Sequence, residues 1–253
     1  MGTVPPEINN QVYDTLGEGW YNAQADPIAL LRAESRLRNP WIEQTIDEHF
    51  GLPPNQVRVL DIGCGGGFLA NHLADRGFSV DAIDRSGPSL RVAARHDRSG
   101  QVRYQEADAF GLPYGDGTFD AVCAMDFLEH VENPRAVVHE ASRVLRPNGL
   151  FFFYTHNRNW LSAFLVIQGV EWFVRDTPEN LHLYRLFIKP GELTQWCSEQ
   201  GLDIKALRGV RPCIFSRAFA GLLLTRSVPE SFEFRFTRSL GISYVGHALK
   251  QGP

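Results

Sequence analysis

One glycine-rich turn constrains this chain more than any other stretch. Residues 57–67 read VRVLDIGCGGG, a short apolar run that ends in an acid and is followed by glycines at 63, 65, 66 and 67. An amphipathic segment follows over residues 68–76. This order predicts a buried strand, a tight turn and a helix. Glycine adopts positive φ without a steric penalty and lets a ligand approach the backbone, so we expect a ligand site at this turn.

The acid at the end of the first expected strand helps to define the ligand. Asp61 would lie at the carboxyl end of the strand, where open α/β sheets bind their ligands. Gly63 and Gly65 match a dinucleotide fingerprint, but Phe68 stands at its third glycine position. A carboxylate beside the loop disfavours pyrophosphate and favours a cation. The alternative is a glycine-rich turn of some other Rossmann-like domain.

The glycine loop also resembles a known motif. The pattern D-x-G-x-G-x-G resembles the first motif of class I S-adenosylmethionine (SAM) methyltransferases, and its members here are Asp61, Gly63, Gly65 and Gly67. SAM carries a sulfonium and an amino group and no phosphate, which suits the acid. The resemblance predicts SAM as the ligand.

Two further aspartates follow expected strands. Asp84 ends the run over residues 78–84, about 20 residues after the glycine loop, where nucleotide folds place a carboxylate for the ribose hydroxyls. Asp108 ends a third strand, where class I methyltransferases hold the adenine amino group. Its alternative is an ordinary loop aspartate. Two strands that both end in an acid at this separation strengthen the prediction of a nucleoside site.

Length, charge and cysteine content narrow the class of protein. A chain of 253 residues can form one domain with an appendage. The net charge of −4 offers no basic surface for nucleic acid. The four cysteines are scattered without a C-x-x-C pair, which favours a reducing cytosol over a disulfide framework. The longest apolar run, residues 160–170, is far shorter than the ~20 residues of a membrane-spanning helix. We therefore expect a cytoplasmic protein.

The order of the elements predicts the fold class. Expected strands over residues 78–84, 101–108, 119–125 and 150–154 alternate with helices, and a sixth strand follows Gly201. Residues 231–236 alternate polar and apolar side chains, as an antiparallel edge strand does, and residues 242–249 continue it. We predict an α/β, Rossmann-like, seven-stranded, mostly parallel sheet with an antiparallel last strand, N-terminal helices and an apolar helical insertion. An N-terminal helical arm or lid would span residues 1–50, with a helix start at Pro40. The methyltransferase domain would span residues 51–253, with the insertion at about 157–190.

The insertion has two interpretations. Residues 160–174 are apolar nearly all round. Because apolar helices are usually buried, a core helix is the favoured interpretation. The alternative is a lid that presents apolar surface to a lipid-like substrate or to a membrane face, which would make the protein peripheral at the membrane.

An acidic segment follows the fourth expected strand. Asp126, Glu129 and His130 are spaced i, i+3 and i+4, so a helical turn would point all three in one direction. Two carboxylates and an imidazole suit a divalent ion such as Mg²⁺. The alternative is a loop without metal, in which Glu129 orients His130.

Four stretches together resemble one methyltransferase family. VLDIGCGGG at 59–67, MDFLEHV at 125–131, THNRN at 155–159 and FIKPGEL at 187–193 look like the O-methyltransferases of ubiquinone biosynthesis. The resemblance covers about residues 31–249. It implies methyl transfer from SAM to a catechol or phenol hydroxyl of a polyprenylated quinone precursor, helped by Mg²⁺. It also implies that Arg38, the glycine loop, Asp84 and Met125 hold SAM. Asp126, Glu129 and His130 would hold the metal, although the family usually has glutamate where this chain has Asp126.

The sequence leaves the base and the acceptor open. A catechol hydroxyl has a pKa near the ~10 of tyrosine, so either a metal or a base must assist its deprotonation. His130, with Glu129, is the first candidate for the base, and His156 and His182 are weaker ones. The acceptor could instead be a soluble aromatic secondary metabolite, or the chain could bind SAM without catalysis. The oligomeric state does not follow from the sequence.

Overall fold

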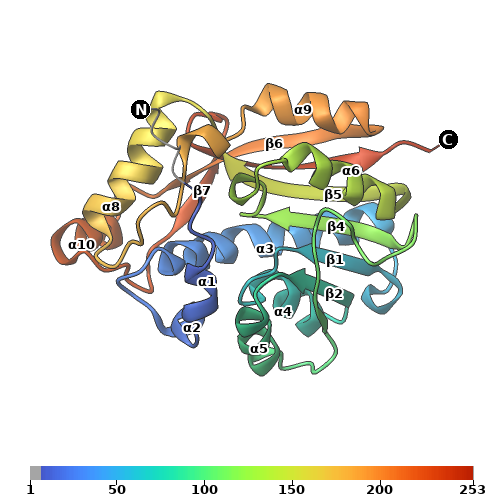
Figure 1. Cartoon of the computed structure of the whole chain (residues 1–253), viewed down its shortest axis with the longest axis horizontal. Coiled ribbons are helices and arrows are strands. Elements are labelled where there is room, and N and C mark those ends of the chain that lie inside the picture. Colours follow the sequence, from blue (N-terminus) through green and yellow to red (C-terminus); the bar gives the residue numbers. More distant parts are fainter. Residues whose placement is uncertain (1–6, 253) are drawn as a thin grey trace.

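The computed structural model describes residues 7–252 and contains one eight-stranded sheet (Figure 1). The strands lie in the order β3-β2-β1-β4-β5-β8-β6-β7. The first five in this order pair in parallel, whereas β8 is antiparallel to β5 and to β6, and β7 is antiparallel to β6. The strands are β1 (Arg58–Ile62), β2 (Ser79–Asp84), β3 (Arg103–Glu106), β4 (Phe119–Met125), β5 (Leu145–His156), β6 (Leu202–Pro212), β7 (Phe234–Thr237) and β8 (Ser243–Lys250).

The predicted α/β fold is confirmed, but the sheet has one strand more than predicted. Residues 243–250 do not continue the strand before them. They form β8, which lies between β5 and β6, while β7 pairs with the outer side of β6 at the sheet edge. The reason is burial: β8 is mostly buried, whereas β7 is half-exposed, so the two strands belong at different places in the sheet.

Helices cover both faces of the sheet. The helices are α1 (Val12–Thr15), α2 (Gly19–Asn22), α3 (Ile28–Phe50), α4 (Phe68–Asp75), α5 (Gly87–His96), α6 (Pro134–Val144), α7 (Trp160–Ser162), α8 (Gly169–Phe173), α9 (Pro190–Glu199) and α10 (Arg217–Thr225). Short turns are η1 (Pro54–Gln56), η2 (Leu128–His130), η4 (Tyr184–Leu186) and the π-helical η3 (Ala163–Gln168). Side chains of α3 and α4 form one core with the sheet, and those of α6 and α9 form another.

Helix α3 runs through Pro40, so the predicted helix start at that residue is wrong. A proline inside a helix removes one backbone donor and costs about 3 kcal/mol. Pro40 is exposed, while Ile42 and Ile46 on the same helix are fully buried against the sheet. The packing of this face offsets the proline and keeps one continuous helix. The N-terminal arm is described from Glu7 onward, since residues 1–6 lie outside the described part.

The apolar segment of residues 160–174 is not core, which corrects the favoured interpretation. It consists of α7, η3 and α8, and of its side chains only Ser162, Val166 and Val174 are buried. Figure 1 shows α8 beside α10, at the same end of the molecule as α1 and α2. Within residues 7–252, no helix is both long and apolar enough to cross a bilayer.

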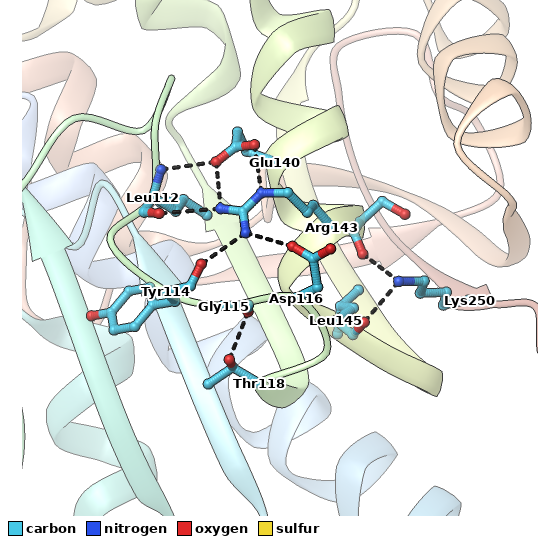
Figure 2. Close-up of polar contacts among 10 residues, drawn as sticks. Leu112, Tyr114, Gly115, Asp116, Thr118, Glu140, Arg143, Leu145 and Lys250 are labelled. Atoms are coloured by element: carbon cyan, nitrogen blue, oxygen red, sulfur yellow. Dashed lines mark hydrogen bonds and ion pairs between the residues drawn. The ribbon is translucent and has the colours of Figure 1, made fainter.

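One arginine fastens the loop between β3 and β4 to α6 (Figure 2). The Arg143 guanidinium donates to the carbonyl oxygens of Leu112 and Tyr114 at 3.1 and 2.8 Å, and to the carboxylates of Asp116 and Glu140 at 2.8–2.9 Å. The Leu112 N–H donates to Glu140 at 2.9 Å. These contacts fix the loop that begins at Asp108.

We expect Arg143→Met to lower the free energy of unfolding by about 2–3 kcal/mol, because it leaves two loop carbonyls and Glu140 without their charged partner. For a domain of this size, that loss corresponds to a fall in melting temperature of about 4–10 °C in calorimetry. The matched control is Arg135→Met on the same helix. Arg135 is 60% exposed and forms a surface ion pair with Glu199, so its loss should cost about 0–1 kcal/mol. Equal losses in both variants would contradict the anchoring role.

Candidate functional site

The glycine loop joins the ends of β1 and β2. The N–H groups of Gly63 and Cys64 donate to the Ile83 carbonyl at 2.9 and 3.0 Å, and the Gly65 N–H donates to the Asp84 carboxylate at 2.8 Å. Gly63 and Gly65 have φ values of 69° and 50°, which side chains rarely adopt. The loop therefore needs glycine for its backbone, and it holds one oxygen of Asp84 in place.

The N-terminal arm covers this loop. A Cβ atom at Gly65 would lie 2.5 Å from the ring of Trp20, so the bare backbone is also a packing surface. The Trp20 indole N–H donates to the Ser89 hydroxyl at 3.0 Å, and the Tyr21 hydroxyl donates to the Gly66 carbonyl at 2.8 Å. The arm is thus fastened to both α5 and the loop.

The same arm reaches the end of β4. The Asn10 side chain donates to the His130 carbonyl at 3.0 Å, and the Tyr13 hydroxyl lies 3.5 Å from His130 Nε2. Tyr13 also stacks on Trp20. Nothing in the sequence placed Tyr13 beside a histidine that follows it by 117 residues.

A cavity of about 1550 Å³ opens at the carboxyl ends of the parallel strands. Ligand pockets usually measure about 300–1,000 Å³, so this one has room for two ligands. One part is lined by Asp61, Gly63, Gly65, Asp84, Asp108 and Met125. The other part is lined by apolar side chains of η3, α8 and α10, among them Phe164, Val170, Trp172, Phe219 and Leu222. His130, His156 and His182 also line the cavity.

The acids of the polar part are held in a poorly hydrated environment. Burial raises the pKa of Asp61 to about 7, and the carboxylates of Asp84 and Asp126 add to the rise. Burial also raises the pKa of Asp84, although the hydrogen bonds that it accepts from Ser86 and Gly65 counteract this. A bound cation would stabilise the ionised form of both acids, as expected for a site that holds SAM.

Arg38 lies in a buried network at the edge of the polar part. Its two terminal nitrogens donate to the two carboxylate oxygens of Asp126 at 2.8 and 2.5 Å. The guanidinium stacks over the Tyr154 ring at 4.0 Å, and Glu34 lies 3.6 Å away and accepts a hydrogen bond from the Tyr154 hydroxyl at 2.8 Å. Burial alone would lower the pKa of Arg38, but Asp126 and Glu34 raise it, so the guanidinium stays charged. Glu34 and Tyr154 were not predicted.

A second buried cluster surrounds Glu129. Within residues 7–252, neither of its carboxylate oxygens has a hydrogen-bond partner, and burial raises its pKa to about 8. His156 Nε2 lies 3.7 Å from Glu129, and His156 Nδ1 is 2.8 Å from the Ser243 hydroxyl. Burial lowers the pKa of His130 to about 3, with His182 adding to the effect. The rings of His130 and His156 lie 5.5 and 5.1 Å from the ring of His182. The imidazoles are therefore neutral at pH 7.

The donor set does not fit a divalent ion in this arrangement. Asp126 has both oxygens engaged by Arg38. Across residues 7–252 there is no group of three histidine, cysteine, aspartate or glutamate side chains that could hold a metal ion. The segment forms only the single turn η2, so Asp126 precedes the turn rather than sharing its face. Magnesium stays a prediction, and no step below is assigned to it.

The remaining predicted residues lie around the same cavity or just behind it. Asp108 and Met125 line the polar part, and the Asp108 carboxylate accepts from the Phe110 N–H at 3.0 Å. Gly67 is the N-cap residue just before α4, and a Cβ there would lie 2.6 Å from the Tyr104 hydroxyl. Gly67 is therefore required by packing behind the loop.

Comparisons with known proteins agree on one class of enzyme. A family model described as a methyltransferase domain matches residues 60–153. A ubiquinone biosynthesis O-methyltransferase from Leptothrix cholodnii is 38% identical over 202 residues, which cover 78% of this chain and 83% of that protein. The protein of the same name from an Azoarcus species is 34% identical over an alignment of 258 positions, which covers 100% of this chain and 100% of that protein.

Solved structures support the fold. A SAM-dependent methyltransferase from Methanosarcina mazei superposes with a TM-score of 0.55 at 22% identity, covering 78% of this chain and 93% of that one. A structure described as the [4+2]-cyclase SpnF gives a TM-score of 0.55 at 21% identity, covering 84% of this chain and 80% of that one. Because a cyclase shares the architecture, the fold alone does not define the reaction.

Proposed function

The chain belongs to the ubiquinone biosynthesis O-methyltransferases, and we propose that its cavity holds SAM, an aromatic ring and an isoprenoid tail in a row. It is a SAM-dependent enzyme that methylates an oxygen of a quinone precursor. The single observation that carries the proposal for this chain is the continuity of the cavity, from the acids at the strand ends to the apolar side chains of η3, α8 and α10.

The polar part of the cavity supports the donor site. Asp84 accepts hydrogen bonds from the ribose hydroxyls, and Asp61 binds the donor's ammonium group. Asp108 accepts a hydrogen bond from the adenine amino group. Met125 forms a wall beside them, and Arg38 takes the donor's carboxylate as a planar fork. The packing of Trp20 on the glycine loop supports the arm as a lid over the donor.

We expect the affinity for S-adenosylhomocysteine (SAH) to rise with pH between 5.5 and 7.5 and then to level off. Asp61 has a pKa of about 7 in the donor-free protein, and the donor's ammonium would lower it, so binding at lower pH must release a proton. Calorimetry in two buffers of different ionisation enthalpy should detect this proton. Asp61→Asn should bind more weakly and without the pH dependence. A flat wild-type profile would rule out Asp61 as the ammonium partner.

The histidines that line the cavity support a site for the acceptor ring. Within residues 7–252, His130 Nδ1 has no hydrogen-bond partner, so it can accept the proton of a phenolic hydroxyl. Because burial lowers the pKa of His130 to about 3 in the donor-free protein, an ionised Glu129 would have to raise that pKa for the transfer to be efficient. The oxygen then forms its bond to the methyl carbon while the bond from that carbon to sulfur breaks, and SAH leaves as a neutral thioether. Neither carboxylate oxygen of Glu129 has a hydrogen-bond partner within residues 7–252, so Glu129 can orient the acceptor's aromatic ring through a hydrogen bond. Holding oxygen and methyl in line supplies much of the rate.

The experiment that tests the function is turnover of catechol acids that differ only in the length of their prenyl tail. SAH and the methylated product would be quantified by chromatography with the full chain and SAM. We expect kcat/KM to rise with tail length, because each buried CH₂ contributes about 0.8 kcal/mol. Equal turnover with and without a tail would remove the isoprenoid assignment and leave the methyltransferase assignment intact.

Exposed apolar side chains near the cavity support contact with a bilayer surface. Trp160, Phe215 and Leu224 are 78, 95 and 85% exposed, and none of them lines the cavity. They lie in α7, before α10 and in α10, the elements next to the apolar part of the cavity. A bilayer would cover these side chains and store a prenylated substrate.

We expect Phe215→Ser combined with Leu224→Ser to weaken binding to anionic vesicles by about tenfold or more, since burying one large apolar side chain contributes about 1.5–3 kcal/mol. Vesicle flotation measures the bound fraction. Leu52→Ser is the control, because Leu52 is 46% exposed and lies before β1, outside the cavity lining. No flotation of the wild type would exclude the bilayer contact.

A further inference from the structure

We infer that Asp126 competes with the donor's carboxylate for the two terminal nitrogens of Arg38, which we call the Arg38 fork. Asp126 occupies this fork in the donor-free enzyme and must leave it when SAM binds. The inference rests on the proposed function, because it assumes that Arg38 receives that carboxylate. It assigns to Asp126 a role in setting donor affinity in place of metal binding.

The geometry of the pair is that of carboxylate recognition. Two parallel N–H···O bonds of 2.8 and 2.5 Å join the terminal nitrogens of Arg38 to the two oxygens of Asp126. A planar guanidinium binds any carboxylate in this way. Both residues line the cavity. A donor carboxylate that approaches Arg38 from the cavity therefore meets a fork that is already filled.

Arg38 is fixed in place independently of Asp126. Its side chain is 2% exposed, and it stacks on Tyr154. Glu34 lies beside it but is bound to the Tyr154 hydroxyl and makes only the longer contact of 3.6 Å to one nitrogen. Glu34 can stay as a counter-charge while the fork opens. The arginine would thus remain a preformed receptor after Asp126 leaves.

Asp126 is less enclosed by the protein than Arg38. It has φ of 53°, which is uncommon for a residue other than glycine, and it lies in the loop between β4 and η2. Its side chain is 18% exposed, against 2% for Arg38. One guanidinium also cannot neutralise three carboxylates, and the incoming carboxylate needs the two nitrogens that Asp126 occupies, so its arrival favours release of Asp126 rather than of Glu34. When Asp126 occupies the fork, a smaller fraction of the enzyme can bind the donor. The apparent Kd for the donor equals the intrinsic Kd divided by that fraction.

The test is calorimetric binding of SAH to the full-length protein in EDTA. We expect Asp126→Asn to bind SAH about three- to thirtyfold more tightly than wild type, because the amide has no charge with which to hold the fork. Asparagine tolerates positive φ, so the loop conformation is kept. Glu34→Gln is the matched control: it removes a carboxylate that lies 3.6 Å from Arg38 without opening the fork, and it should not tighten binding.

Each other outcome overturns the inference. Unchanged or weaker binding by Asp126→Asn would mean that Asp126 does not compete. Equal tightening in both variants would indicate general electrostatics. If millimolar Mg²⁺ changes SAH affinity in wild type but not in Asp126→Asn, Asp126 is a metal ligand and the competitor role is wrong. Absence of SAH binding by wild type would instead refute the proposed function. Melting temperatures of both variants show whether they are folded.

Discussion

Replacing His130 with glutamine is expected to lower kcat/KM for a catechol acceptor about 10²–10⁴-fold, the usual contribution of a general base. Glutamine keeps a polar side chain of similar reach but cannot accept the proton. The imidazole is buried and lines the cavity, and its Nδ1 has no hydrogen-bond partner among residues 7–252. Steady-state kinetics would measure the loss, and SAH affinity should stay within about twofold, because the loss lies in the transition state.

Two other histidines serve as controls for this result. His139 is exposed on α6, contacts Gln200 and lies outside the cavity lining, so His139→Gln should leave kcat/KM unchanged. His182→Gln tests the neighbouring ring, which we expect to affect the rate by less than about tenfold, because a group that only neighbours the base transfers no proton. If His130→Gln keeps a third or more of wild-type turnover, the base lies elsewhere. Glu129 and His156 are then the next candidates, since they are 3.7 Å apart.

Replacing Asp84 with asparagine should weaken SAH binding about 10–100-fold. Hydrogen bonds to a charged group contribute about 1.5–3 kcal/mol, and each 1.4 kcal/mol is a factor of about ten in Kd. Asp84 ends β2 and lines the polar part of the cavity, with one oxygen held by Gly65 and the other by Ser86. Asparagine can still accept the Ser86 N–H, so the turn should survive. Isothermal titration calorimetry would measure Kd.

The control for Asp84 is a second aspartate with the same local role. Asp97 follows α5 and accepts from the N–H groups of Ser99 and Val102 at 3.0 Å each, but it does not line the cavity. Asp97→Asn should therefore change stability slightly and SAH affinity not at all. If both variants lose affinity equally, the effect of Asp84→Asn is structural. A Kd unchanged in Asp84→Asn would exclude the ribose assignment.

Family membership and residue roles have different support. Relatives aligned over the full chain establish the reaction class. The pairing of Arg38 with Asp126 rests on the geometry of this structure. Aspartate brings its carboxylate into a fork with the arginine, and this pair removes one of the three expected metal ligands.

The sequence by itself determined the parts of the site that depend on neighbouring residues. The glycine loop and the acids at the ends of β1 and β2 were predicted and are present. Strand ends, turns and caps are set by side chains a few positions apart, so a local pattern is enough to place them. The parallel order of strands then brings these ends to one edge of the sheet.

Only the tertiary structure decided what depends on distant contacts. Arg38 and Asp126 are 88 residues apart, so their pairing could not be read from either segment. The same holds for the strand β8, which lies between β5 and β6 because of burial, and for α3, which continues through Pro40 because the packing of its other face offsets the proline. The exposure of residues 160–174 was wrongly predicted because hydrophobicity measures affinity for an apolar environment and does not say whether protein, substrate or bilayer provides it.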